Sequence, residues 1–99
     1  MSALRWTRRA LQDLVAIGEF IGADKPVAAR DWISRLRKSA RTAAKMPRVG
    51  RRVPEVDMDD VREVVMRGYR IVYRIERNGV LVLTVFEGHR QLSRDLGLS

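Results

Sequence analysis

The chain has 99 residues, enough for a single domain with one hydrophobic core. It carries 20 Lys and Arg against 12 Asp and Glu, and the net charge of +8 favours an acidic partner: nucleic acid, an acidic protein segment or an anionic membrane surface. The absence of cysteine excludes a disulfide scaffold, a thiol nucleophile and a Cys-based zinc site. The single histidine, His89, excludes a multi-histidine metal site unless carboxylates supply nearly all the ligands, and we expect neither a metal nor a cofactor.

The cellular location is predicted from the absence of a membrane-spanning run and of a secretory signal pattern. No apolar run approaches the roughly 20 residues that a membrane-spanning helix needs. The first six residues also lack the basic-then-apolar layout of a secretory signal. These features predict a soluble protein of the cytoplasm with no membrane partner.

The first half of the chain is predicted to hold a short edge strand and two helices. The strand covers Ala3–Trp6, and the first helix runs from the capping residue Thr7 to Gly22. Asp24-Lys25-Pro26 offers a cap and a proline for a second helix, from Pro26 to about Lys45. The short link between them predicts an antiparallel helical hairpin. The expected apolar stripes are Leu11, Leu14, Val15, Gly18 and Ile21 in the first helix, and Ala29, Ile33, Leu36, Ala40 and Ala43 or Ala44 in the second.

The second half is predicted to be a meander of three strands. Met46 to Asp60 is a connector broken by prolines and a glycine, and Glu55, Asp57, Asp59 and Asp60 make it locally acidic. The apolar period then changes to two, giving strands over 61–66, 69–76 and 80–86, with tight turns at Gly68 and Asn78-Gly79. The tail from residue 88 onward is polar and too short for an independent element. We predict one α+β domain over residues 1–99, in the order β-α-α-β-β-β, with the helical hairpin on one face of a small, mostly antiparallel sheet.

The middle strand separates apolar from charged side chains. Tyr69, Ile71, Tyr73 and Ile75 are predicted to face the helices, and Arg70, Val72, Arg74 and Glu76 the open face. Arg62, Arg67 and Glu87 on neighbouring strands can join this second set. Two interpretations are open: a binding surface, or a solvated sheet face with weak ion pairs in which Glu76 pairs with an arginine.

The positive charge is concentrated in the N-terminal half, which has a balance of +9 over residues 1–54 against −1 over residues 55–99. Arg35 to Arg52 includes eight basic residues and no acidic one. One helix face carries Arg30, Arg37, Arg41 and Lys45. This face can bind phosphates or an acidic protein segment, or it can simply be a solvated surface. The lack of interleaved aromatic residues argues against base stacking.

The second half also contains two motifs that resemble the RelE/ParE superfamily of bacterial toxins. The segment Val64 to Ile75, VVMRGYRIVYRI, is similar to the family's "gyRivYri" strand, and Val82 to Arg90, VLTVFEGHR, to its closing strand. The start of the first helix, ALQDL, is similar to the family's "s-A--DL--I" beginning. The element order agrees, and the resemblance spans nearly the whole chain.

The superfamily has two functional branches. RelE-type members are ribosome-dependent mRNA endoribonucleases, and for that activity the resemblance implies Arg70, His89 and Arg90 as catalytic residues. ParE-type members inhibit DNA gyrase. The tail has no tyrosine, and Glu87 stands where ParE members usually have histidine; a carboxylate there repels a phosphate. The interpretation we favour is a ParE-like gyrase inhibitor without catalytic residues.

A toxin of either branch implies a cognate antitoxin, here ParD-like, whose C-terminal segment wraps the toxin to form a hetero-oligomer. Exposed apolar surface beside the helical hairpin would be its signature. A third possibility is a basic nucleic-acid-binding module, whose affinity for DNA would fall steeply with salt. The residues expected to contact target or antitoxin are Arg30, Arg37, Arg41, Lys45, Arg67, Arg70, Arg74, Glu87 and Arg90.

Overall fold

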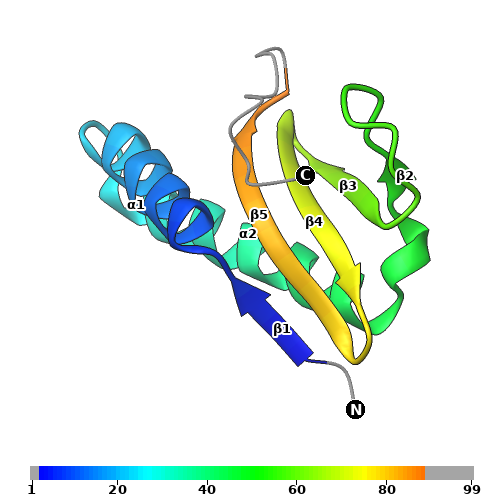
Figure 1. The fold of residues 1–99 in the computed structure, drawn as a ribbon. Coiled ribbons are helices and arrows are strands. Elements are labelled where there is room, and N and C mark those ends of the chain that lie inside the picture. The colour runs from blue at the N-terminus through cyan, green and yellow to red at the C-terminus, as the bar shows by residue number, and fades with distance from the viewer. Residues whose placement is uncertain (1–2, 89–99) are drawn as a thin grey trace.

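Residues 3–88 are described by a computed structural model of the chain, and they form two helices packed on a five-stranded sheet (Figure 1). The elements are β1 (Ala3–Trp6), α1 (Arg8–Gly22), α2 (Pro26–Lys45), a 3₁₀ turn η1 (Pro47–Val49), β2 (Arg51–Arg52), β3 (Val61–Met66), β4 (Tyr69–Glu76) and β5 (Gly79–Glu87). The predicted α+β class, the helical hairpin and the mostly antiparallel sheet are confirmed. The predicted tail from His89 onward lies outside the described residues.

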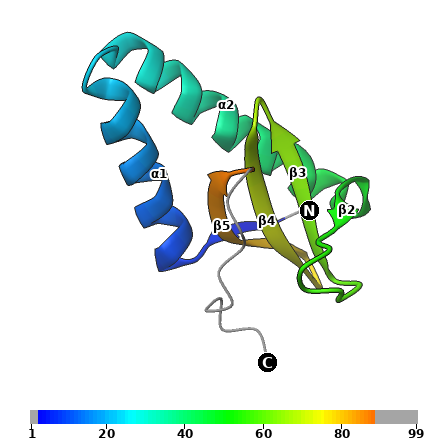
Figure 2. The same ribbon diagram turned by 90° about the horizontal axis from the view of Figure 1, so that it is seen from above.

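The sheet has the order β1-β5-β4-β3-β2. β1 is parallel to β5, and the other neighbours are antiparallel. The predicted order lacked β2, because a two-residue strand inside the connector has no apolar period to detect. Both helices lie on the same side of the sheet, diverging from their shared turn (Figure 2).

Local sequence signals determine where the helices begin. The Thr7 hydroxyl accepts a hydrogen bond from the Ala10 amide at 3.0 Å, as expected of an N-cap. α2 begins with Pro26, whose missing amide hydrogen costs nothing in the first turn. Its N-cap is Lys25, without a side-chain cap, so the cap suggested for Asp24-Lys25-Pro26 is absent.

The turn between β3 and β4 follows the backbone demands of a tight hairpin. Arg67 and Gly68 both have positive φ, 48° and 89°, as a two-residue turn matching the strand twist requires. The β4–β5 turn contains Arg77 and Asn78, one position before the predicted pair, and Gly79 already belongs to β5. A side chain at Gly79 would collide with the backbone of Ala3, so close pairing of β1 with β5 requires this glycine.

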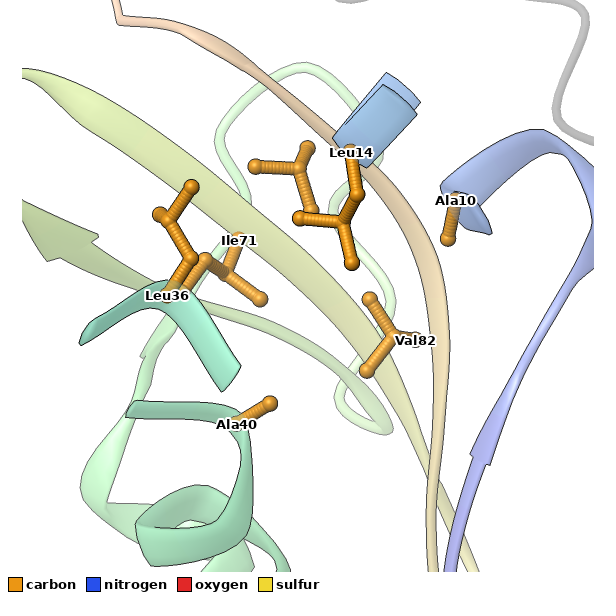
Figure 3. Packing of buried hydrophobic residues seen from close by; sticks show 7 residues of the cluster. Ala10, Leu14, Leu36, Ala40, Ile71 and Val82 are labelled. Carbon is orange, nitrogen blue, oxygen red and sulfur yellow. The ribbon is translucent and has the colours of Figure 1, made fainter. Parts of the chain in front are cut away.

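The main core fills the space between the helices and the sheet (Figure 3). The predicted stripe of α2 is confirmed by its buried residues, but that of α1 is partly wrong: Ala10 and Leu14 are buried, whereas Leu11 is 43% and Val15 59% exposed. β5 contributes two valines three positions apart, because its register against β4 shifts by one residue between Val72 and Tyr73. The members are Ala10, Leu14, Leu36, Ala40, Ile71, Val82 and Val85.

A second apolar cluster lies on the sheet face away from the helices. Val72 of β4 is fully buried there, against Val53 of the connector. Val56 and Met58, also from the connector, pack on the same cluster. The predicted division of β4 into two faces is confirmed, since Ile71 packs with the helices and Val72 does not. Of the two open interpretations, the solvated face does not hold at Val72 and Arg70, because Val72 is buried against Val53 of the connector and Arg70 is buried with Glu55 of the connector as a partner.

Candidate partner-binding surfaces

Arg70, the strand arginine singled out from the sequence, lies in the interior. Only 8% of its side chain is exposed, and its guanidinium is 2.6 Å from a carboxylate oxygen of Glu63, a side chain with no exposed surface. Two further hydrogen bonds of 2.8 Å go to Glu55 of the connector. The guanidinium carbon also lies 4.9 Å from the ring centre of Phe86. Arg70 therefore fastens the connector to the sheet.

The two carboxylates set the protonation of this cluster. The hydrogen bonds that Arg70 donates to Glu55 and, less strongly, to Glu63 raise the pKa of Arg70 above its ordinary value, although burial acts in the opposite direction. Glu63 also accepts a hydrogen bond of 2.5 Å from Arg51 of β2. The cluster is thus a charged but internally compensated group with little capacity to attract an outside phosphate.

The acidic connector neutralises most of the basic residues near it. Asp59 pairs with Arg48 at 3.0 Å and with Arg62 at 2.9 Å, and Asp57 pairs with Arg52 at 3.0 Å. The hydrogen bond from Arg48 is the main reason that the pKa of Asp59 lies below its ordinary value. The basic stretch read from the sequence is therefore not uniformly available to a partner.

Unpaired positive charge remains along α2. Arg30, Arg41 and Lys45 are exposed and form no salt bridge with any residue between 3 and 88. Arg37 lies with its guanidinium carbon 5.8 Å from the ring centre of Trp6. The basic face predicted on this helix is therefore present and exposed along α2.

The remaining predicted contact residues that the structure describes lie on the strands and their turns. Arg67 lies 5.7 Å from the ring centre of Trp32, which packs edge-on against Tyr69. Arg74 lies on β4, with its Nε 3.7 Å from Asp60. Glu87 ends β5, and Glu76 pairs with Arg5 of β1 at 2.7 Å rather than with Arg70 or Arg74. His89 and Arg90 lie outside the described residues.

Exposed apolar side chains occur on α1, where sequence reasoning placed a buried stripe. Leu11 and Val15 lie one turn apart and line a shallow depression; we call them the α1 apolar face. On another side of the same helix, Phe20 is 75% exposed and lines a cleft of about 250 Å³ with Tyr69 and Phe86. Such surface beside the helical hairpin was the expected mark of a bound protein segment.

No metal site or membrane span emerges from the part of the chain that the structure describes. Its acidic side chains form no group of three or more that could hold a metal ion. None of its helices combines the length and apolar character that crossing a bilayer requires.

Comparison with known proteins adds the family. Residues 4–92 match the model for the ParE toxin of the type II toxin–antitoxin system, parDE. A Sinorhizobium fredii protein named as a toxin, Y4kP, is 38% identical over 90 residues, covering 89% of this chain and 90% of its own length. Toxin RelE2 of Caulobacter vibrioides is 43% identical over 51 residues, covering 52% of this chain and 58% of its own length.

The fold has a counterpart among solved structures. A chain of the chromosomal ParDE toxin–antitoxin system from P. aeruginosa superimposes with a TM-score of 0.74, covering 88% of this chain and 96% of that one, at 20% identity. Fold and sequence together define a toxin of the RelE/ParE superfamily. Within that class, the chain belongs to the ParE toxin family of type II toxin–antitoxin systems.

Proposed function

We propose that the protein is a cytoplasmic toxin that inhibits DNA gyrase, and so blocks replication, without chemistry of its own. One observation carries this choice over the nuclease branch: the strand arginine Arg70 is buried and held by Glu55 and Glu63. A nuclease needs a cation aimed at the scissile phosphate. Here the cation at that position already has two carboxylate partners, and freeing it would leave a buried charge uncompensated.

The neutralising partner is proposed to be a ParD-like antitoxin that forms a hetero-oligomer with the toxin. Two features support this partner. The α1 apolar face and the cleft beside Phe20 offer apolar surface to an amphipathic segment. The exposed cations of α2 that form no salt bridge within residues 3–88 favour a segment that is also acidic.

The test is a supercoiling assay with purified gyrase, relaxed plasmid and ATP, into which the protein is titrated. We expect supercoiling to fall and linear DNA to accumulate after the reaction is stopped with detergent and protease. Adding the antitoxin in equal amounts should restore supercoiling. Undiminished supercoiling at a large molar excess of toxin would reject the gyrase proposal.

A second candidate function is ribosome-dependent mRNA cleavage, favoured by the similarity to Toxin RelE2. Its test is A-site cleavage in a translating extract, with His89→Ala/Arg90→Ala as the diagnostic variant. Arg70→Ala is a poor choice, because its burial predicts loss of toxicity through unfolding whichever target is correct. Cleavage by the wild type that disappears in the His89→Ala/Arg90→Ala protein would favour this candidate.

A further inference from the structure

A groove lies at the C-terminal end of α2, away from the α1 apolar face. It has a volume of about 970 Å³ and lies between η1 and the turn that joins β4 to β5. A smaller hollow beside Leu4 shares Ala44 with it and continues it toward β1. We call this combined feature the end groove. The C-terminal end of α2, which borders the groove, is the end of this helix far from the turn that links the two helices (Figure 1).

The floor and one lip of the end groove are apolar. Ala44 is buried, and Leu4 and Ile75 are partly buried and contribute to the floor. Met46 and Val49 form the lip with 61% and 60% of their surfaces exposed. A partner that covers these exposed apolar side chains stabilises the complex by about 25 cal/mol for each Å² of apolar surface removed from water. The groove thus favours an occupant with apolar side chains of its own.

The rim of the end groove is positively charged. Arg41 and Lys45 come from α2 and Arg77 from the β4–β5 turn, and none of the three forms a salt bridge within residues 3–88. Arg48 adds a fourth cation, paired only at the surface with Asp59. The lining carboxylate, Glu76, is already held by Arg5 through both of its oxygens. The rim therefore presents an excess of unpaired positive charge.

The chemistry of this groove favours a peptide over a nucleic acid. Its lining includes no aromatic ring on which a base could stack. Phosphates would satisfy the cations but would leave Met46 and Val49 in water. An acidic peptide with interspersed apolar side chains complements both the rim cations and the apolar floor, since its carboxylates reach the rim while its apolar groups cover the floor.

We propose that the end groove binds an acidic, partly apolar segment of the antitoxin. The inference rests on the proposed toxin–antitoxin pairing and adds a second docking point, distinct from the α1 apolar face. Of the four α2 cations predicted as antitoxin contacts, it selects Arg41 and Lys45. Arg30 lies 11 residues before Arg41, about 16 Å away along the helix, and does not line the groove.

The experiment compares two toxin variants of equal net charge. Arg41→Glu/Lys45→Glu reverses two rim cations, and Lys25→Glu/Lys38→Glu reverses two exposed cations that do not line the groove. Binding of the purified antitoxin is measured by calorimetry at low and at moderate salt. We expect the rim variant to bind about tenfold more weakly or worse, and the control to stay within about threefold of the wild type. Val49→Asp, at an exposed position, should also weaken binding.

Each possible failure has its own signature. Equal weakening by the rim variant and its control would indicate general charge attraction and overturn the groove assignment while leaving the toxin–antitoxin pairing intact. Wild-type toxin that does not bind the antitoxin would overturn both proposals. If Val49→Asp instead converts a toxin dimer to a monomer in sedimentation, a second copy occupies the groove and the assignment is overturned. Circular dichroism confirms that every variant is folded.

Discussion

The substitution Glu63→Gln tests whether the buried charge cluster holds the connector on the sheet. The side chain of Glu63 has no exposed surface, and its carboxylate binds both Arg70 and Arg51. Glutamine keeps the size but removes the charge that compensates Arg70. Breaking a buried ion pair from one side costs about 3–5 kcal/mol, but Arg70 keeps its two bonds to Glu55, so we expect about 2–3 kcal/mol. At 4–8 °C per kcal/mol, Tm should fall by roughly 8–24 °C.

The companion variant Glu55→Gln removes the other carboxylate partner of Arg70 and shows how much the ion pairs of Arg70 contribute to stability. Glu55 is 35% exposed, so its loss alone should cost about 1 kcal/mol. The double variant leaves Arg70 buried without a carboxylate, and its cost should exceed the sum of the single costs by about 1 kcal/mol or more. Urea unfolding gives all three values, with Glu76→Gln, a surface pair with Arg5, as the control. A Glu63→Gln protein within about 0.5 kcal/mol of the wild type would refute the reasoning.

Three further predictions concern other fixed contacts. Asp13→Ala removes the acceptor for the Thr84 hydroxyl and the Val85 amide and should cost about 2–3 kcal/mol in urea unfolding; an unchanged midpoint would show that water replaces it. Burial raises the pKa of Tyr73, so its contribution to folding stability is present below about pH 10 and is lost as pH rises further. Above that pH, the stability of the Tyr73→Phe protein, followed by circular dichroism, should fall less steeply with pH than that of the wild type. The contribution of Asp59 to folding stability is present above its ordinary pKa of 3.8 and is lost as pH falls through the lower pKa of the folded state. In the Arg48→Ala protein, an NMR titration should find the pKa of Asp59 raised. An unchanged pKa would contradict the pairing.

The elements with a strong apolar period were predictable from the sequence, and the contacts across distant segments were not. The period of two over β4 correctly separated Ile71 from Val72. The error in α1 begins in its first turn: Ala10 is fully buried, whereas the more hydrophobic Leu11 next to it is 43% exposed. One residue of difference rotates the buried face by about 100° and exposes Leu11.

The candidate site was predictable in charge but not in location. Sequence spacing correctly placed Arg41 and Lys45 on an exposed face of α2. It could not show that Arg70 is buried, because its carboxylate partners come from another strand and from a connector without regular structure. The connector's own apolar residues, Val53 above all, were the only sequence signal that it covers the sheet.

The parallel pairing of β1 with β5 has a consequence for how the protein is made. The hydroxyl of Thr7, directly after β1, donates a hydrogen bond to the carbonyl of Leu83, 76 positions later in the chain. At about 5–20 residues per second, a ribosome takes roughly 4–15 s to add that many residues. During that time β1 has no partner strand, and the main core lacks the valines of β5. A chain whose synthesis stops before β5 cannot complete the fold, so the folded toxin comes into existence only late in its own translation.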